Sequence, residues 1–93
     1  MHVGILQVVL HVPDAHSLKD KRRIVKGLLD RARARFEVAA AEVDDQDVWQ
    51  STVLGFACVS NETKHAADRM NKLLDWIRAT PAASIVEHEL EIL

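Results

Sequence analysis

The order in which two kinds of apolar periodicity follow one another is the sequence feature that most restricts how this chain can fold. Residues His2–Val12 are rich in Val, Ile and Leu at both odd and even positions, as in a central strand covered on at least one face. The segment Ser17–Arg35 instead repeats apolar residues at helical spacing. Two strand-like segments, Glu37–Val43 and Ser51–Val59, come next and predict a hairpin.

The remaining third of the chain contains one more helix pattern and one more strand pattern. Ser60-Asn61 offers a helix cap, and apolar residues follow at helical spacing until Thr80-Pro81, where the proline is expected to end the helix. The last segment, Ser84–Leu93, alternates and predicts a half-exposed antiparallel strand. Its expected inner residues are Val86, His88, Leu90 and Ile92, and its expected outer residues are Ile85, Glu87, Glu89 and Glu91.

The resulting order, β-α-β-β-α-β, predicts an α+β fold of the ferredoxin-like type. In this arrangement two right-handed split crossovers give a four-stranded antiparallel sheet with both helices on one face. A length of 93 residues suits one domain, 1–93, with one core. The apolar fraction of 48% is sufficient for that core.

Cysteine usage and apolar run lengths indicate where the protein resides. The one cysteine, Cys58, excludes an internal disulfide and lies in a strand-like apolar run, so we expect a buried thiol. No apolar stretch approaches the roughly 18 residues of a membrane span. The chain begins with a strand-like run and without a basic leader, and we therefore expect a cytoplasmic protein that has no membrane partner.

Basic residues are concentrated in the first predicted helix. The segment Ser17–Arg35 holds eight of the 12 basic residues and two of the 14 acidic ones, which leaves +6 there and −8 in the rest of the chain. The net charge of −2 therefore does not exclude a polyanionic partner. Five of the cations fall on one stripe beside the apolar face: Lys19, Arg22, Arg23, Lys26 and Arg33. Lys21, Arg31 and Arg35 are assigned to the other side.

The start of this helix contains an internal conflict. Ser17 is a good N-cap, and Asp20 three residues later forms a short-armed capping box. Four cations in the first turn oppose the helix dipole, at a cost of about 0.3–1 kcal/mol each where exposed. They are Lys19, Lys21, Arg22 and Arg23. Local conflicts of this kind are found preferentially at functional sites.

The five-residue basic stripe is the candidate RNA- or phosphate-binding site. Each Lys or Arg can neutralise a phosphate, and the counterions released supply most of the non-specific affinity for nucleic acid. Two other interpretations remain open. The stripe is alternatively a solvated face that keeps the protein soluble, or a surface that contacts the acidic face of a neighbouring copy.

The acidic connection between the two hairpin strands supplies the candidate protein-interaction residues, Gln46, Trp49 and Gln50. An aromatic side chain beside a charged loop often anchors an interface, although a tryptophan that covers the end of a small core is the commoner case. The open face of the sheet offers a second surface, and a homodimer could bury Val9 and Ile85 there.

Catalytic and metal-binding patterns are not found in the sequence. The connection Pro13-Asp14-Ala15-His16 lacks the glycines of a phosphate-binding loop such as that of acylphosphatase-like enzymes. His11, Asp14 and His16 are close in sequence, but no third strong ligand is spaced with them. We therefore expect a protein that is not an enzyme and that holds no metal or other cofactor.

Four runs together carry a resemblance to a known family: Leu10-His11-Val12-Pro13, Ser17–Arg23, Ala41–Gln50 and Glu89–Leu93. Through them, the chain resembles the bacterial YlxP-like family of unknown function over essentially its whole length. The resemblance implies a ferredoxin-like fold and a bacterial cytosolic protein, often encoded beside translation initiation and ribosome-assembly factors. It implies no established activity, cofactor or catalytic residue.

Two functional hypotheses follow. The first is a non-enzymatic factor that binds structured RNA or the ribosome through the basic stripe. The second is a protein-interaction or self-assembly module that uses the open sheet face and the Gln46–Gln50 loop.

Overall fold

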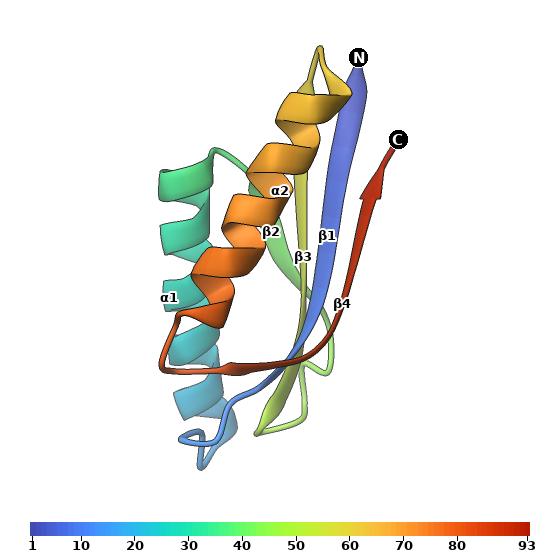
Figure 1. Cartoon of the computed structure of the whole chain (residues 1–93). Helices are drawn as coiled ribbons and strands as arrows, with labels where there is room; N and C mark the ends of the chain where they lie inside the picture. The colour runs from blue at the N-terminus through green and yellow to red at the C-terminus, as the bar shows by residue number, and fades with distance from the viewer.

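The computed structural model describes residues 1–93 and contains four strands and two helices. In chain order they are β1 (His2–His11), α1 (Leu18–Phe36), β2 (Ala39–Asp44), β3 (Ser51–Ser60), α2 (Thr63–Arg78) and β4 (Ser84–Ile92). The strands form one antiparallel sheet in the order β2-β3-β1-β4. Both helices lie on the same side of this sheet (Figure 1). This is the ferredoxin-like α+β arrangement, which confirms the predicted fold class.

The core lies between the sheet and the two helices. It contains the apolar faces of α1 and α2, packed against the inward residues of β1 and β3. Phe56 and Cys58 of β3 are buried within it, which confirms the expected buried thiol. Phe36 and Trp76 join the two helices by an edge-to-face contact, with ring centroids 5.7 Å apart. Neither helix combines the length and the apolarity that a membrane span requires.

A side chain caps the N-terminus of α1, whereas no side chain caps the N-terminus of α2. The Ser17 hydroxyl accepts a hydrogen bond from the Asp20 backbone N–H at 3.0 Å, which confirms Ser17 as the N-cap. The Asp20 carboxylate accepts from the His16 N–H at 3.3 Å, one residue before the position of a standard capping box. In α2 the N-cap is Glu62, with no side-chain bond, so the cap predicted at Ser60-Asn61 is wrong. The Ser60 hydroxyl instead accepts from the Glu62 N–H.

A bulge in β4 changes which residues face the core. Leu10 lies opposite Ile85 and Val9 lies opposite Glu87, so Val86 has no partner in β1. Ile85 consequently packs against the core, whereas Val86 is 67% exposed, and the predicted faces of these two residues are wrong. His88 shares the helix side of the sheet with its partner Val8 but remains exposed. Leu90 and Ile92 pack against the core as predicted.

The sheet face opposite the helices carries a shallow apolar cleft with a volume of about 390 Å³. Small residues of β2 and β3 form its floor, and Ile5 and Val43 lie at its sides. A Cβ atom on Gly55 would lie 3.0 Å from Val43 Cγ1, so the glycine leaves room for the Val43 side chain. Ile85 does not belong to this open face, which corrects its predicted part in a dimer interface.

Candidate nucleic-acid interface and the loop beside it

The five cations of the basic stripe are all exposed along α1. From Lys19 to Arg33 they cover about 21 Å of helix axis, at about 1.5 Å per residue. Because α1 is one continuous helix, their spacing places them on one side of it, beside the face that packs on the core. The structure thus brings the five predicted residues into one surface.

Two acidic residues of α1 lie within this surface and pair with three of its cations. Asp20 pairs with Arg23 at 3.2 Å, and Asp30 pairs with Lys26 at 2.6 Å and with Arg33 at 3.1 Å. The hydrogen bond from Lys26, together with the positive charges of Lys26 and Arg33, lowers the pKa of Asp30. Counted with Asp20 and Asp30, the stripe carries +3, since five cations meet two carboxylates.

The stripe residues differ in how firmly their side chains are held. Arg33 also donates to the backbone carbonyl of Ala40 in β2 at 2.6 Å, which ties its guanidinium to the edge of the sheet. Lys19 and Arg22 have no ion-pair partner. These two cations are therefore free to meet an anionic partner without first leaving another contact.

Lys21 is fully buried, although it lies in the same first turn of α1 as the exposed cations. Its Nζ atom donates to the backbone carbonyls of Asp45, of Val48 at 2.7 Å and of Ser51 at 3.0 Å. The Glu42 carboxylate lies 3.0 Å from the same atom. All three ammonium protons are thereby used, and the buried charge has an acidic partner.

The assignment of Lys21 to the side away from the core is therefore wrong. The position of Lys21 around the helix axis could have shown that it faces the core. Lys21 lies about 60° from Leu18 around the helix axis, and Leu28 lies about 80° away on the same side. Lys21 thus falls within the arc that packs on the core, at the level where the β2–β3 loop approaches α1.

The β2–β3 loop, residues 45–50, is closed around the Lys21 ammonium group. Asp45 adopts a left-handed conformation with φ of 60°, and its carbonyl also accepts from the Val48 N–H at 3.1 Å. The Ser51 hydroxyl donates to the Asp45 carboxylate at 2.8 Å. Next to the loop, the Thr52 hydroxyl donates to Glu42. These bonds fix the loop backbone from both ends.

Gln50 fastens the same loop to the connection between β1 and α1. Its side-chain amide donates to the carbonyls of Pro13 at 3.2 Å and Ala15 at 3.3 Å. Its backbone carbonyl accepts from the Val12 N–H at 2.9 Å and lies 3.1 Å from His11 Nδ1. The Gln50 side chain is thus engaged within the protein.

The other two candidate interaction residues, Gln46 and Trp49, are exposed on this loop. Trp49 is 54% exposed and does not belong to the side chains that pack against the core. The interpretation of Trp49 as a cover for the core is therefore wrong. Val48 beside it is also about half exposed, so a fixed loop presents two neighbouring apolar side chains to solvent.

Comparison with known proteins assigns the chain to a family. A family model described as "Protein of unknown function (DUF503)" matches residues 3–90. The chain is also 33% identical over 79 residues to the "Uncharacterized protein YlxP" of Bacillus subtilis (strain 168), an alignment that covers 85% of this chain and 86% of that protein. The protein therefore belongs to the DUF503 family, whose function is unknown.

Proposed function

We propose that the protein is a non-enzymatic factor that binds structured RNA, such as ribosomal RNA, through the basic stripe on α1. The observation that carries this proposal is the exposure of Lys19, Arg22, Arg23, Lys26 and Arg33 along about 21 Å of one helix. Cations in such a row can contact successive phosphates, and each contact releases condensed counterions.

The carboxylates inside the stripe do not prevent this binding. Ion pairs between exposed side chains contribute only about 0–1 kcal/mol, so a phosphate can replace Asp20 or Asp30 as partner. Asp30 also limits the rotamers of Lys26 and Arg33 before binding, because both side chains bond to the same carboxylate. Cations already restricted in this way lose less conformational entropy when they meet a phosphate.

The proposal is tested by reversing three charges of the stripe together, with Arg22→Glu, Lys26→Glu and Arg33→Glu. Co-sedimentation with ribosomal particles should be lost, while the melting temperature stays nearly unchanged because all three side chains are exposed. The matched control is Arg31→Glu, Lys64→Glu and Arg78→Glu, which changes the net charge equally but lies outside the stripe. Equal loss in both variants would show a net-charge effect and would contradict the proposal.

A pull-down from lysate, with and without nuclease and at low and moderate salt, identifies the class of partner. Partners that disappear after nuclease treatment support RNA binding. Partners that resist nuclease and depend on Trp49 support the second candidate below.

The second candidate is a protein-interaction module, and the observation that favours it is the fixed loop with Val48 and Trp49 exposed. A loop held in one conformation loses little entropy on binding, and tryptophan is enriched among the residues that dominate interface energies. In the self-assembly version of this candidate, two copies of the chain pack through their open sheet faces. Light scattering over a dilution series tests this dimer, and a monomer at the highest concentrations would exclude it.

A further inference from the structure

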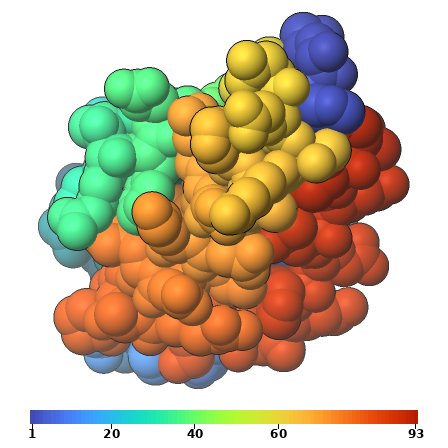
Figure 2. Space-filling model, turned by 45° about the horizontal axis from the view of Figure 1, so that its top comes forward, coloured from blue at the N-terminus to red at the C-terminus, as the bar shows by residue number.

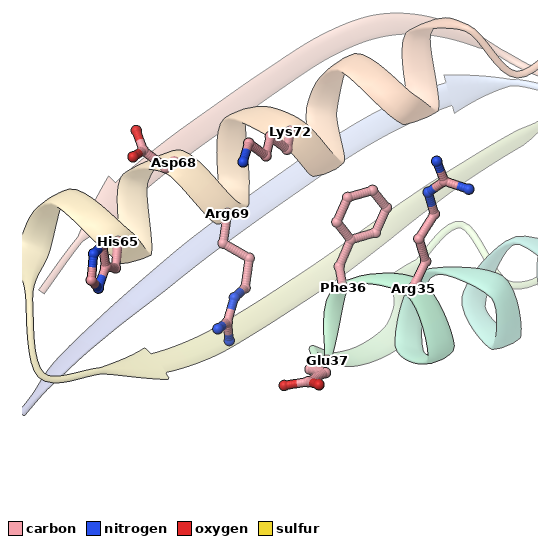
Figure 3. Close-up of a pocket in the computed structure, with 7 residues that line it drawn as sticks. All are labelled: Arg35, Phe36, Glu37, His65, Asp68, Arg69 and Lys72. Carbon is pink, nitrogen blue, oxygen red and sulfur yellow. The ribbon is translucent and has the colours of Figure 1, made fainter.

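A second group of cations lies where the C-terminal end of α1 faces α2, on residues that are not part of the basic stripe. The last turn of α1 lies against the first half of α2 (Figure 2). Between them is a cleft with a volume of about 450 Å³, within the range of small-molecule sites. Its lining residues are Arg35, Phe36 and Glu37 at the end of α1, and His65, Asp68, Arg69 and Lys72 on α2 (Figure 3).

The three permanent cations of this cleft have no ion-pair partner. Arg35, Arg69 and Lys72 take part in none of the salt bridges of the protein, although the carboxylates of Glu37 and Asp68 line the same cleft. The Arg69 side chain extends from α2 toward the end of α1, and Lys72 lies on the following turn (Figure 3). The cleft thus holds three cations from two helices and two carboxylates, and none of these cations is paired directly with a carboxylate.

The cleft also has an apolar wall and two groups that accept hydrogen bonds. The ring of Phe36 projects between the helices and is held by the edge-to-face contact with Trp76. The Arg35 guanidinium lies 5.9 Å from the Phe36 ring centroid. Glu37 and Asp68 accept hydrogen bonds when ionised. The combination suits a ligand that carries a phosphate, hydroxyl or amine donors, and a planar apolar part.

We infer that this cleft binds a nucleoside phosphate, with Arg69 and Lys72 of α2 at the phosphate, the Phe36 ring beside the base and Glu37 accepting from the sugar or base. The nucleoside phosphate has two sources, a free nucleotide or the phosphorylated 5′ end of an RNA strand. Charge-assisted hydrogen bonds to Arg and Lys supply the recognition in both cases. The inference is independent of the basic stripe, since the two surfaces share no residue.

The test is a titration of the full chain with adenosine 5′-monophosphate, followed by NMR of backbone amides. Signals of residues 35–37 and 65–72 should shift with a saturable dependence on concentration. Adenosine without phosphate should leave them unchanged, and inorganic phosphate should bind more weakly than the nucleotide. A pentanucleotide RNA with and without a 5′-phosphate distinguishes the two sources, because only the phosphorylated form should compete for an end-binding site.

Arg69→Gln and Lys72→Gln should each weaken binding about tenfold, the effect of one lost charge-assisted bond. Lys64→Gln, on the same helix but outside the cleft, is the matched control and should leave the affinity unchanged. The variant with Arg22, Lys26 and Arg33 replaced by Glu should bind the nucleotide normally, so failure of the proposed RNA function would not affect this result. The inference is overturned if neither probe shifts these signals, or if Arg69→Gln and Lys72→Gln bind as the wild type does.

Discussion

Lys21 and Arg22 are neighbours in the sequence and carry the same charge, but they belong to two regions with opposite physical properties. Lys21 has no solvent exposure and is held by three carbonyls and one carboxylate of the β2–β3 region. Arg22 is exposed and has no ion-pair partner. A rotation of 100° around one helix thus separates a structural cation from a candidate binding cation.

Contact with solvent decides what each of these two charges can do. Removing an ammonium group from water costs several kcal/mol, so Lys21 is stable in place only while all of its partners remain. The charges of the stripe stay hydrated, and their ion pairs contribute little to folding. Substitutions in the buried network should therefore change stability, and substitutions in the stripe should change binding.

The largest expected effect is that of Lys21→Met, which fills the space without the charge. It leaves Glu42 without its cation and removes the Lys21 donor from three carbonyls, so the free energy of unfolding should fall by about 3–5 kcal/mol. Arg22→Met is the matched control and should change it by less than about 0.5 kcal/mol. Urea unfolding of both variants measures the difference, and similar losses would contradict the separation of the two regions.

Glu42→Gln should have an intermediate effect. It keeps an acceptor for the Thr52 hydroxyl and the carbonyl ligands of Lys21, but it leaves the buried charge uncompensated. We expect a loss of about 1–3 kcal/mol in the free energy of unfolding. Asp30→Asn, which removes an exposed carboxylate of the stripe, is the control for loss of an acidic group and should cost less than about 1 kcal/mol. Calorimetric melting of both variants tests this order.

Trp49→Ala should change stability by less than about 0.5 kcal/mol, because its side chain is half exposed and does not pack on the core. If Trp49 anchors a partner, the same substitution should abolish the nuclease-resistant interaction. A large loss of stability would instead mean that the side chain covers the core in solution.

The smallest expected effect is the contribution of Asp30 to the pH dependence of stability. Because Lys26 and Arg33 lower the pKa of Asp30 in the folded protein, its ionised form stabilises the fold above its ordinary value of 3.8. That contribution is lost as pH falls through the lowered folded value. An NMR titration of the Asp30 carboxyl carbon should show this, and Lys26→Met should raise the pKa toward the ordinary value. An unchanged titration in Lys26→Met would show that the pair does not form in solution.

Local periodicity was sufficient to predict the order of elements and an apolar face on each helix, and residue type was sufficient to predict the N-cap at Ser17. The bulge at Val86 could not be predicted, because it depends on the register between β1 and β4 and an alternating pattern hides the extra residue. The five stripe residues were predictable because they share one helix. The network of Lys21 with Glu42 and the cleft that Arg35 and Arg69 both line depend on contacts between distant segments.

RNA binding through α1 is tested most directly by the salt dependence of the affinity for purified ribosomal RNA. If all five stripe cations meet phosphates, log K should fall with log salt concentration with a slope of about −3.5 to −4.5. Arg22→Gln should reduce the size of that slope by about 0.7–0.9 and leave stability unchanged. An affinity that does not depend on salt, or a slope that Arg22→Gln leaves unaltered, would contradict RNA binding through α1.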